Sequence, residues 1–282
     1  MEIKSALIVV NITKEDALQV ATDIEGYLSD IGIAVEVHRF EGKSGDYSVK
    51  GCDIAFSLGG DGTVLYCARL LANHGIPIFA INVGDFGFIT EVSKDEWKET
   101  FEQYRKGKLG ISERLMIETT VYRCGKEISV HHGLNDSVIA AAGISKVVRL
   151  SVDVGDTALG RYRADGVIIA TPTGSTAYSA AAGGPILAPE MDALILNPIC
   201  PFTLSNRPLV LPGDKPVFIT IEEKQRTDIF LTVDGQEVIS LAEGDKLKLQ
   251  PAKVKLKIVR SDRRNFYEVL RSKLNWSGGP NA

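Results

Sequence analysis

The hydrophobic positions of the first hundred residues follow two alternating patterns. Short apolar runs typical of buried strands occupy residues 5–11, 33–40, 52–58 and 76–83. Between them, apolar residues recur at the three- and four-residue spacing of helices, over residues 17–28, 64–71 and 95–106. Because strands separated by helices need crossover connections, this order predicts an α/β fold with a Rossmann-like parallel sheet. Thr13 is the predicted N-cap of the first helix, and Gly75 is placed to end the second.

After about residue 111 the pattern changes to that of successive strands. Apolar runs separated by turn residues occupy residues 115–122, 127–132, 146–154, 216–222, 228–239 and 246–259. In the third run, Val148, Leu150 and Val152 alternate with polar residues, which is the period of a half-buried strand. This pattern is typical of a β-rich domain of the β-sandwich type.

These two patterns define two expected domains. We expect an α/β domain over residues 1–110 and a β-rich domain over residues 111–260. Apolar residues return at helical spacing near the end of the chain, at positions 266, 269, 270 and 274. The tail 261–282 is therefore expected to form a helix that closes the first domain.

Composition and charge exclude several classes of protein. The 282 residues carry a net charge of −4, and no apolar stretch approaches the roughly 20 residues that span a bilayer. The N-terminus lacks a basic stretch and a cleavage site, so we expect no signal peptide. The cysteines form no C-x-x-C pair, which favours unpaired thiols in a reducing cytoplasm: Cys52, Cys67, Cys124 and Cys200.

The alternating lysines of residues 246–257 have two interpretations. Such a row is compatible with nucleic-acid binding, but it is also the solvent face of an amphipathic strand. The acidic balance of the whole chain favours the second interpretation, so we expect no nucleic-acid partner.

Several familiar catalytic motifs are absent. No G-x-G-x-x-G follows a predicted strand, and H-E-x-x-H, G-x-S-x-G and a cysteine–histidine cluster are all missing. The adjacent His131 and His132 are expected to form a strand pair rather than a pair of metal ligands. Hydrolase and metalloprotease chemistry is therefore not indicated.

The stretch Gly59-Gly60-Asp61-Gly62-Thr63 stands where a buried strand ends and a helix begins. Glycines permit positive φ and let a ligand approach the main chain, and the following helix offers its N-terminal amides to an anion. An aspartate there would repel phosphate unless it accepts a proton or holds a metal. The alternative is an aspartate that only caps the helix in a glycine-rich turn. Spacing alone leaves both interpretations open.

A second stretch, residues 161–186, favours a binding site. It continues from a basic pair and an Asp-Gly into a dense run of glycine, threonine, serine and alanine. Such a run packs poorly as a core but can lie against a flat, polar ligand and donate many hydrogen bonds. The stretch contains Pro172, Tyr178 and Pro185, which restrict its conformations and argue against a flexible loop.

Together these stretches resemble the NAD kinase family. The resemblance runs from about residue 5 to 260 and rests on "GGDGT" (59–63), "INVGDFGFITE" (81–91), "LNDSVI" (134–139), "RADGVIIATPTGSTAYS" (163–179), "NRPLVLP" (206–212) and "VDGQ" (233–236). GGDGT-type loops also occur in diacylglycerol and sphingosine kinases. The long middle block is the more specific part and indicates NAD as the substrate.

The resemblance implies phosphoryl transfer from ATP to the 2′-hydroxyl of the adenosine ribose of NAD. By this resemblance Asp61 is the candidate base, with Gly59, Gly60, Gly62 and Thr63 in the phosphate loop. A divalent cation, Mg²⁺ or Mn²⁺, is expected to arrive with ATP, and no dedicated metal site is visible in the sequence.

The resemblance also implies which residues contact NAD. The β-rich domain would be the NAD-binding domain, and Phe88 is similar to the aromatic residue that lies against adenine. The remaining implied NAD contacts are Asp61, Gly62, Asn135, Asp136, Arg163, Asp165, Thr176, Ala177, Tyr178 and Asp234. For Asp234 a second interpretation stays open, because "VDGQ" predicts an Asp-Gly hairpin turn that would form without a ligand.

Four residues depart from the family pattern. Asp136 replaces a glutamate, Asp85 follows Gly84 where a histidine is usual, Phe202 replaces a histidine and Ala181 replaces a serine. These changes bear on the choice of phosphate donor and on the choice between NAD and NADH.

Two other hypotheses carry weight. One is a lipid kinase that uses the same loop, although no basic amphipathic helix for membrane docking is found. The other is a non-catalytic NAD(H) sensor, which a lost loop aspartate would have indicated; Asp61 is intact. Members of the resembled family assemble as dimers or tetramers in which neighbouring subunits contribute to the NAD pocket, so a homo-oligomer is expected.

Overall fold

The computed structural model describes residues 2–42, 47–84, 87–143, 146–203 and 205–275. It divides the chain into two compact units, one of residues 1–114 with 256–282 and one of residues 115–255. Each unit is described by itself. In the described part of the chain, no helix is long and apolar enough to cross a membrane.

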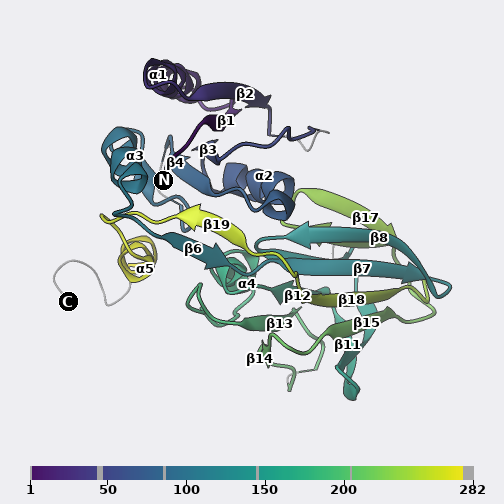
Figure 1. Ribbon diagram of the computed structural model, residues 1–282. Helices are drawn as coiled ribbons and strands as arrows, with labels where there is room; N and C mark the ends of the chain where they lie inside the picture. Colours follow the sequence, from purple (N-terminus) through teal and green to yellow (C-terminus); the bar gives the residue numbers. More distant parts are fainter. Residues whose placement is uncertain (1, 43–46, 85–86, 144–145, 204, 276–282) are drawn as a thin grey trace. The chain divides into compact units, whose positions relative to one another are not determined.

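The first unit is built on a mixed, mostly parallel sheet (Figure 1). Its strands are β1 (Ser5–Asn11), β2 (Ala34–Phe40), β3 (Ile54–Gly59), β4 (Ile78–Asn82), β5 (Val92–Ser93), β6 (Ile111–Arg114) and β19 (Leu256–Val259). They follow the order β2-β1-β3-β4-β19-β6, with β5 beside β4. All pairs are parallel except β19 with β6. The predicted parallel sheet is confirmed, with one antiparallel pair added at its edge.

Helices lie on both sides of this sheet. They are α1 (Ala17–Asp30), α2 (Asp61–Leu71), a 3₁₀ turn (Ala72–His74), α3 (Trp97–Arg105) and α5 (Phe266–Leu274). α1 and α3 share one hydrophobic core with strand residues such as Ile8 and Phe56. α2 contributes nothing to that core and packs on β1, β3 and β4 instead. Strands that are covered on both faces have apolar residues at nearly every position. This explains the continuous apolar runs in the sequence.

The helix-end predictions had different outcomes. Gly75 ends the second helical segment in a left-handed conformation with φ of 66°, as expected. Thr13 is not the N-cap of α1, because that position belongs to Asp16. The Asn11 side chain accepts hydrogen bonds from the N–H and the hydroxyl of Thr13, at 3.1 and 2.7 Å, and this turn delays the helix.

The second unit contains two six-stranded antiparallel sheets. One has the order β11-β10-β15-β18-β7-β8 and the other the order β14-β13-β12-β9-β16-β17. The strands are β7 (Ile117–Arg123), β8 (Lys126–Gly133), β9 (Asp136–Ala141), β10 (Val148–Val154), β11 (Thr157–Ala164), β12 (Gly166–Ala170), β13 (Ala193–Ile199), β14 (Leu209–Pro212), β15 (Val217–Ile221), β16 (Ile229–Val233), β17 (Glu237–Leu241) and β18 (Lys246–Pro251).

A single hydrophobic core joins the two sheets into a sandwich. Val148, Leu150 and Val152 from one sheet pack in the same cluster as Ile139 and Ile169 from the other. The predicted alternation in residues 148–152 is therefore confirmed, since these three residues are buried and the two between them are half-buried.

The lysine-rich run of residues 246–259 forms two strands rather than one. β18 belongs to the sandwich, and β19 joins the sheet of the first unit. Within β18, Leu247 and Leu249 face the core while Lys246 is exposed. Its lysines therefore occupy the outer face of an amphipathic strand, as predicted.

Candidate active site

The predicted phosphate loop, residues 59–63, lies at the carboxyl end of β3, where α/β proteins bind ligands. Gly60 is the N-cap of α2 and Asp61 is its first residue. Asp61 is therefore not the cap, and no side chain caps this helix. A Cβ on Gly59 would overlap the Thr63 side chain, whereas a Cβ on Gly60 would meet no heavy atom within 4 Å. Gly59 is required by packing, and Gly60 leaves open space in front of the loop.

The Asp61 carboxylate is tied to the segment that follows β4. Its Oδ2 accepts the N–H of Phe88 at 2.7 Å, and its Oδ1 accepts the N–H groups of Ile89 and Thr90, both at 3.2 Å. The Thr90 hydroxyl adds a fourth hydrogen bond at 3.2 Å. A side chain on Gly87 would overlap this carboxylate. Asp61 thus holds the backbone of residues 88–90, which includes Phe88, in place.

Phe88 is also contacted by the C-terminal helix. The Lys273 Nζ of α5 lies 5.7 Å from the centre of the Phe88 ring, within the range of a cation–π contact. Arg264 anchors the start of this tail through bonds to both Glu96 carboxylate oxygens, at 2.7 and 3.0 Å. The tail was predicted from its helical spacing, but its contact with Phe88 was not. The predicted departure at Asp85 lies outside the described residues.

In the second unit, Asp234 organises the predicted ribose-binding segment. Its carboxylate accepts the N–H groups of Leu134, Asn135 and Asp136, at 2.8, 2.7 and 3.1 Å. Asp234 and Gly235 have φ of 52° and 65°, as expected for an Asp-Gly turn. A hairpin turn does not need the carboxylate bonds, so Asp234 does more than form the turn.

Asp136 and Asp234 are two neighbouring buried carboxyl groups, 4% and 7% exposed. Burial, and then the charge of Asp234, raise the pKa of Asp136 to about 7. Among the described residues, nothing pairs with the buried Asn135 Oδ1. This corner therefore contains a titratable carboxyl and an acceptor that a ligand hydroxyl could satisfy.

The small-residue stretch folds into an ordered turn against the same segment. It contains a 3₁₀ turn (Thr173–Thr176) and the short helix α4 (Tyr178–Ala181). The Thr171 hydroxyl donates to the Leu134 carbonyl at 2.5 Å, and a Cβ on Gly174 would overlap the Asn135 backbone. Tyr178 remains 49% exposed on this turn. A large aromatic side chain on an ordered, exposed turn is available to a ligand.

Arg163 and Asp165 are not part of this cluster within one chain. The ladder between β9 and β12 places Gly166 opposite Ala140 and Ala170 opposite Asp136. At about 3.3 Å per residue, the start of β12 lies roughly 13 Å from Asp136 along the strands. The Arg163 guanidinium instead lies 5.0 Å from the centre of the Phe202 ring, which is 72% exposed.

His131 and His132 are strand residues of β8, as predicted. His131 Nδ1 is hydrogen-bonded to Glu237 at 2.9 Å, and His132 lies 3.4 Å from Glu118. Among the described residues, no group of three or more His, Cys, Asp or Glu could hold a metal ion.

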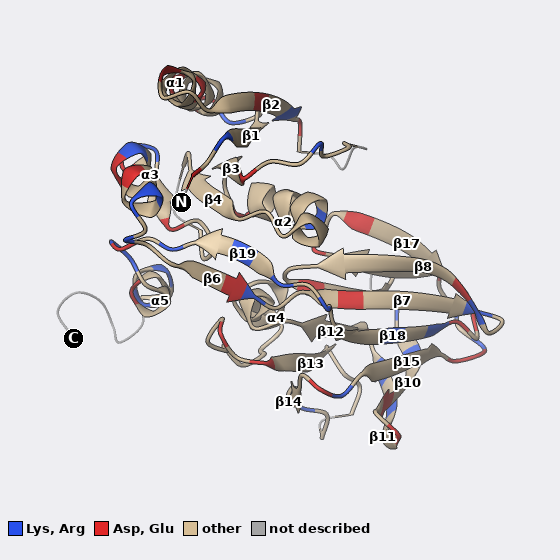
Figure 2. Ribbon diagram, viewed as in Figure 1, with Lys and Arg blue, Asp and Glu red and all other residues tan. Residues whose placement is uncertain are grey.

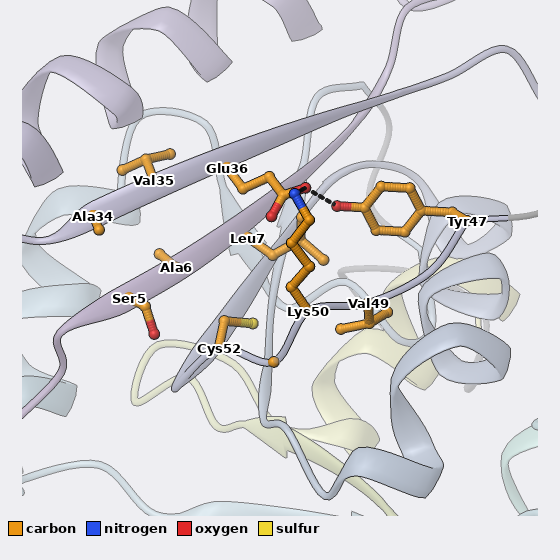
Figure 3. Close-up of a pocket in the computed structure, with 11 residues that line it drawn as sticks. Ser5, Ala6, Leu7, Ala34, Val35, Glu36, Tyr47, Val49, Lys50 and Cys52 are labelled. Atoms are coloured by element: carbon orange, nitrogen blue, oxygen red, sulfur yellow. Dashed lines mark hydrogen bonds and ion pairs between the residues drawn. The ribbon is translucent and has the colours of Figure 1, made fainter.

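A separate pocket of about 240 Å³ lies along the first halves of β1 and β2 (Figure 3). Tyr47 and Lys50 point toward Glu36 there, and the Tyr47 hydroxyl donates to Glu36 at 2.8 Å. None of the predicted site residues lines it. Because ligands bind at the carboxyl ends of parallel strands, this pocket is not the active site.

Comparisons with known proteins agree with the geometry of these segments. Residues 43–109 match the ATP-NAD kinase N-terminal domain, and residues 134–261 match the ATP-NAD kinase C-terminal domain. The NAD kinase of Treponema denticola is 44% identical over 276 residues, 98% of this chain and 97% of that protein. The NAD kinase of Treponema pallidum (strain Nichols) is 40% identical, over 96% of this chain and 90% of that protein.

Solved structures show the same fold. The yeast NADH kinase complexed with NADH has a TM-score of 0.86 and 22% identity, covering 98% of this chain and 88% of that chain. An NAD kinase from Archaeoglobus fulgidus in complex with ATP has a TM-score of 0.75 and 24% identity, covering 96% of this chain and 98% of that chain.

The two family-model matches identify the class of the protein as an ATP-dependent kinase. The full-length relatives then settle its class: the chain belongs to the NAD kinase family. Its activity is transfer of the γ-phosphate of ATP to the 2′-hydroxyl of the adenosine ribose of NAD, which gives NADP. The lipid-kinase and sensor hypotheses are thereby set aside.

Proposed function

We propose that Asp61 is the base of this kinase and that its Oδ2 receives the proton of the attacking 2′-hydroxyl. The observation that supports this proposal is the hydrogen-bond pattern of the Asp61 carboxylate. Oδ1 accepts three hydrogen bonds and Oδ2 accepts one among the described residues, so Oδ2 retains acceptor capacity. Gly59, Gly60, Gly62 and Thr63 would receive the phosphates at the positive N-terminus of α2.

The proposed NAD-binding residues have separate roles. Phe88 would stack on adenine, and Asn135 and Asp136 would bind ribose hydroxyls. The unpaired Asn135 Oδ1 supports this assignment because a buried acceptor needs a donor. Further proposed contacts are Gly62, Thr176, Ala177, Tyr178 and Asp234.

A divalent cation, Mg²⁺ or Mn²⁺, is proposed to accompany ATP. Bound to the phosphate oxygens, it would neutralise their negative charge during transfer. Asp61 is the acidic side chain of the proposed phosphate loop, and a carboxylate oxygen is the kind of ligand that such hard cations take. The residues 59–63 would orient the phosphates, whichever of the two metals is present.

We propose that the enzyme is a homo-oligomer in which Arg163 and Asp165 complete the NAD site of a neighbouring subunit. Both residues precede β12, whose opposite end pairs with Asp136, and this separation supports the arrangement. It is tested by mixing Asp61→Asn with Arg163→Ala protein. If Arg163 acts across subunits, the mixture regains activity at sites with both native residues; if it acts within its own subunit, the mixture stays inactive.

A cytoplasmic location is also proposed. All four cysteines are free thiols, including the exposed Cys124 and Cys200, which suits a reducing compartment.

The base assignment is tested by NADP formation from NAD, ATP and Mg²⁺, followed with an NADP-specific dehydrogenase. Parallel reactions contain NADH in place of NAD, or polyphosphate in place of ATP, and rank the two acceptors and the two donors. Asp61→Asn should keep NAD binding by calorimetry and lose turnover by about 10²–10⁴-fold. A variant with nearly normal kcat would mean that another group is the base.

A further inference from the structure

A second cavity, lined mainly by basic side chains, lies in the β-sandwich unit. Its volume is about 260 Å³, and five basic side chains line it together with Val147, Gln225 and Thr227: Lys146, Arg149, Arg163, Lys224 and Arg226. No aspartate or glutamate lines this cavity. Basic residues are blue in Figure 2, and in most of the ribbon they are interspersed with red acidic ones. Cations gathered without a carboxylate repel one another and destabilise the fold unless an anion joins them.

Two acidic residues near the cavity wall have other partners. Glu222 lies 3.2 Å from Arg161 and accepts the Ser151 hydroxyl at 2.7 Å. Glu243 accepts the backbone N–H of Gln225 at 2.7 Å. Within the described ranges, none of the five lining cations has a carboxylate within 4.0 Å. Their charges are therefore available to a ligand.

The wall of the cavity is held in place by Gln225. Its side-chain amide donates to the carbonyls of Arg149 and Glu222, at 2.7 and 3.0 Å, and accepts the Arg149 N–H at 3.2 Å. On the other side, Arg163 is oriented by its contact with the Phe202 ring at 5.0 Å. Arg149 is half-buried and the other four cations are exposed, so their charged groups are accessible to an anion from solution.

We propose that this cavity, which we call the basic cavity, is a binding site for a compact polyphosphate anion of two or three phosphates. Five cations match the charge of such an anion. The volume is below the roughly 300–1,000 Å³ of pockets for drug-sized ligands, so it suits a phosphate chain and not a whole dinucleotide. The proposal does not depend on the role given to Asp61. It shares Arg163 with the NAD site proposed for a neighbouring subunit, so the test variants leave Arg163 unchanged.

Calorimetric titration with sodium tripolyphosphate tests the proposal on the full-length protein without added metal. The double variant Lys224→Gln/Arg226→Gln removes two charges from the basic cavity. The control Lys246→Gln/Lys253→Gln removes two exposed lysines of the same unit that do not line it. We expect tripolyphosphate affinity to fall about tenfold or more in the first variant and less than about twofold in the control.

Three results would overturn the proposal: no binding by the native protein, equal loss in both variants, or no loss in either. Lys146→Gln serves as a second cavity variant if the double variant fails to fold. Titration with ATP then separates the two sources of the anion. A parallel loss of ATP affinity assigns the cavity to the phosphate tail of a nucleotide, and unchanged ATP affinity assigns it to free polyphosphate; both support the site.

Discussion

The carboxylate of Asp61 accepts the backbone N–H of Phe88 at 2.7 Å, and this bond joins the phosphate loop to the segment that carries the ring. Asp61 can therefore act in two ways, as the base of the reaction and as an anchor of residues 88–90. The two roles have different consequences for substrate affinity and for turnover.

Substitutions at Asp61 should separate these roles. Asn retains one acceptor oxygen and can hold part of the segment, so Asp61→Asn should lower kcat with little change in the KM for NAD. Asp61→Ala removes every acceptor and should lower kcat and also raise KM severalfold. Steady-state kinetics of both variants provide the measurement. Equal KM values in the two variants would argue against the anchoring role.

Gly59 and Gly60 should respond differently to alanine. A Cβ on Gly59 would overlap Thr63, so Gly59→Ala should destabilise the fold by about 1–3 kcal/mol. A Cβ on Gly60 enters open space, so Gly60→Ala should fold normally and lose activity through steric exclusion of phosphate. Urea unfolding and kinetics on both variants test this. An active, stable Gly60→Ala protein would place the phosphates elsewhere.

Much of the fold could be predicted because its signals are local. Strands such as β1 and β3 are buried on both faces, and a continuous apolar run reveals them. The place of β19 could not be predicted, because its four residues pair with β4 and β6, both more than 100 residues earlier. Local pattern carries no information on such long-range register.

The same distinction between local and long-range information applies to the candidate site. The positions of Asp61 and Asp234 could be found from motifs, but their partners could not. The Asp61 carboxylate binds backbone 27 to 29 residues away, and that of Asp234 binds backbone 98 to 100 residues away. The basic cavity likewise gathers residues from three separate segments, which no local pattern places together.

Asp136 should make stability depend on pH. Its ordinary pKa of 3.8 is raised to about 7 in the fold, so between these values the folded chain holds a proton that the unfolded chain has released. The free energy of unfolding therefore falls as pH rises through this interval, by at most about 4 kcal/mol. Asp136→Asn should remove that fall and be the more stable protein at pH 8. Urea unfolding at pH 5 and 8 measures this, and a difference between the proteins that does not vary with pH would contradict it.

Arg264 should hold the tail against the first unit. Its guanidinium bonds both oxygens of Glu96 and thereby lowers the pKa of Glu96 to about 2. Arg264→Ala should lower the free energy of unfolding by about 1–2 kcal/mol at neutral pH. The native contribution is complete above pH 4.5 and is lost as pH falls toward 2, so the two proteins should converge in acid. Thermal unfolding across this range is the measurement, and a constant difference would mean that packing dominates.

Lys273 should affect nucleotide affinity through Phe88. Its ammonium lies 5.7 Å from the centre of the ring proposed to stack on adenine, where it can orient the ring. A cation–π contact at an exposed site is worth about 0.5–1 kcal/mol, which corresponds to a two- to fivefold change in affinity. Lys273→Ala should therefore raise the KM for NAD or ATP by that factor with kcat unchanged, and Lys273→Arg should restore it. Unchanged KM values for both nucleotides would mean that the helix serves only to close the first unit.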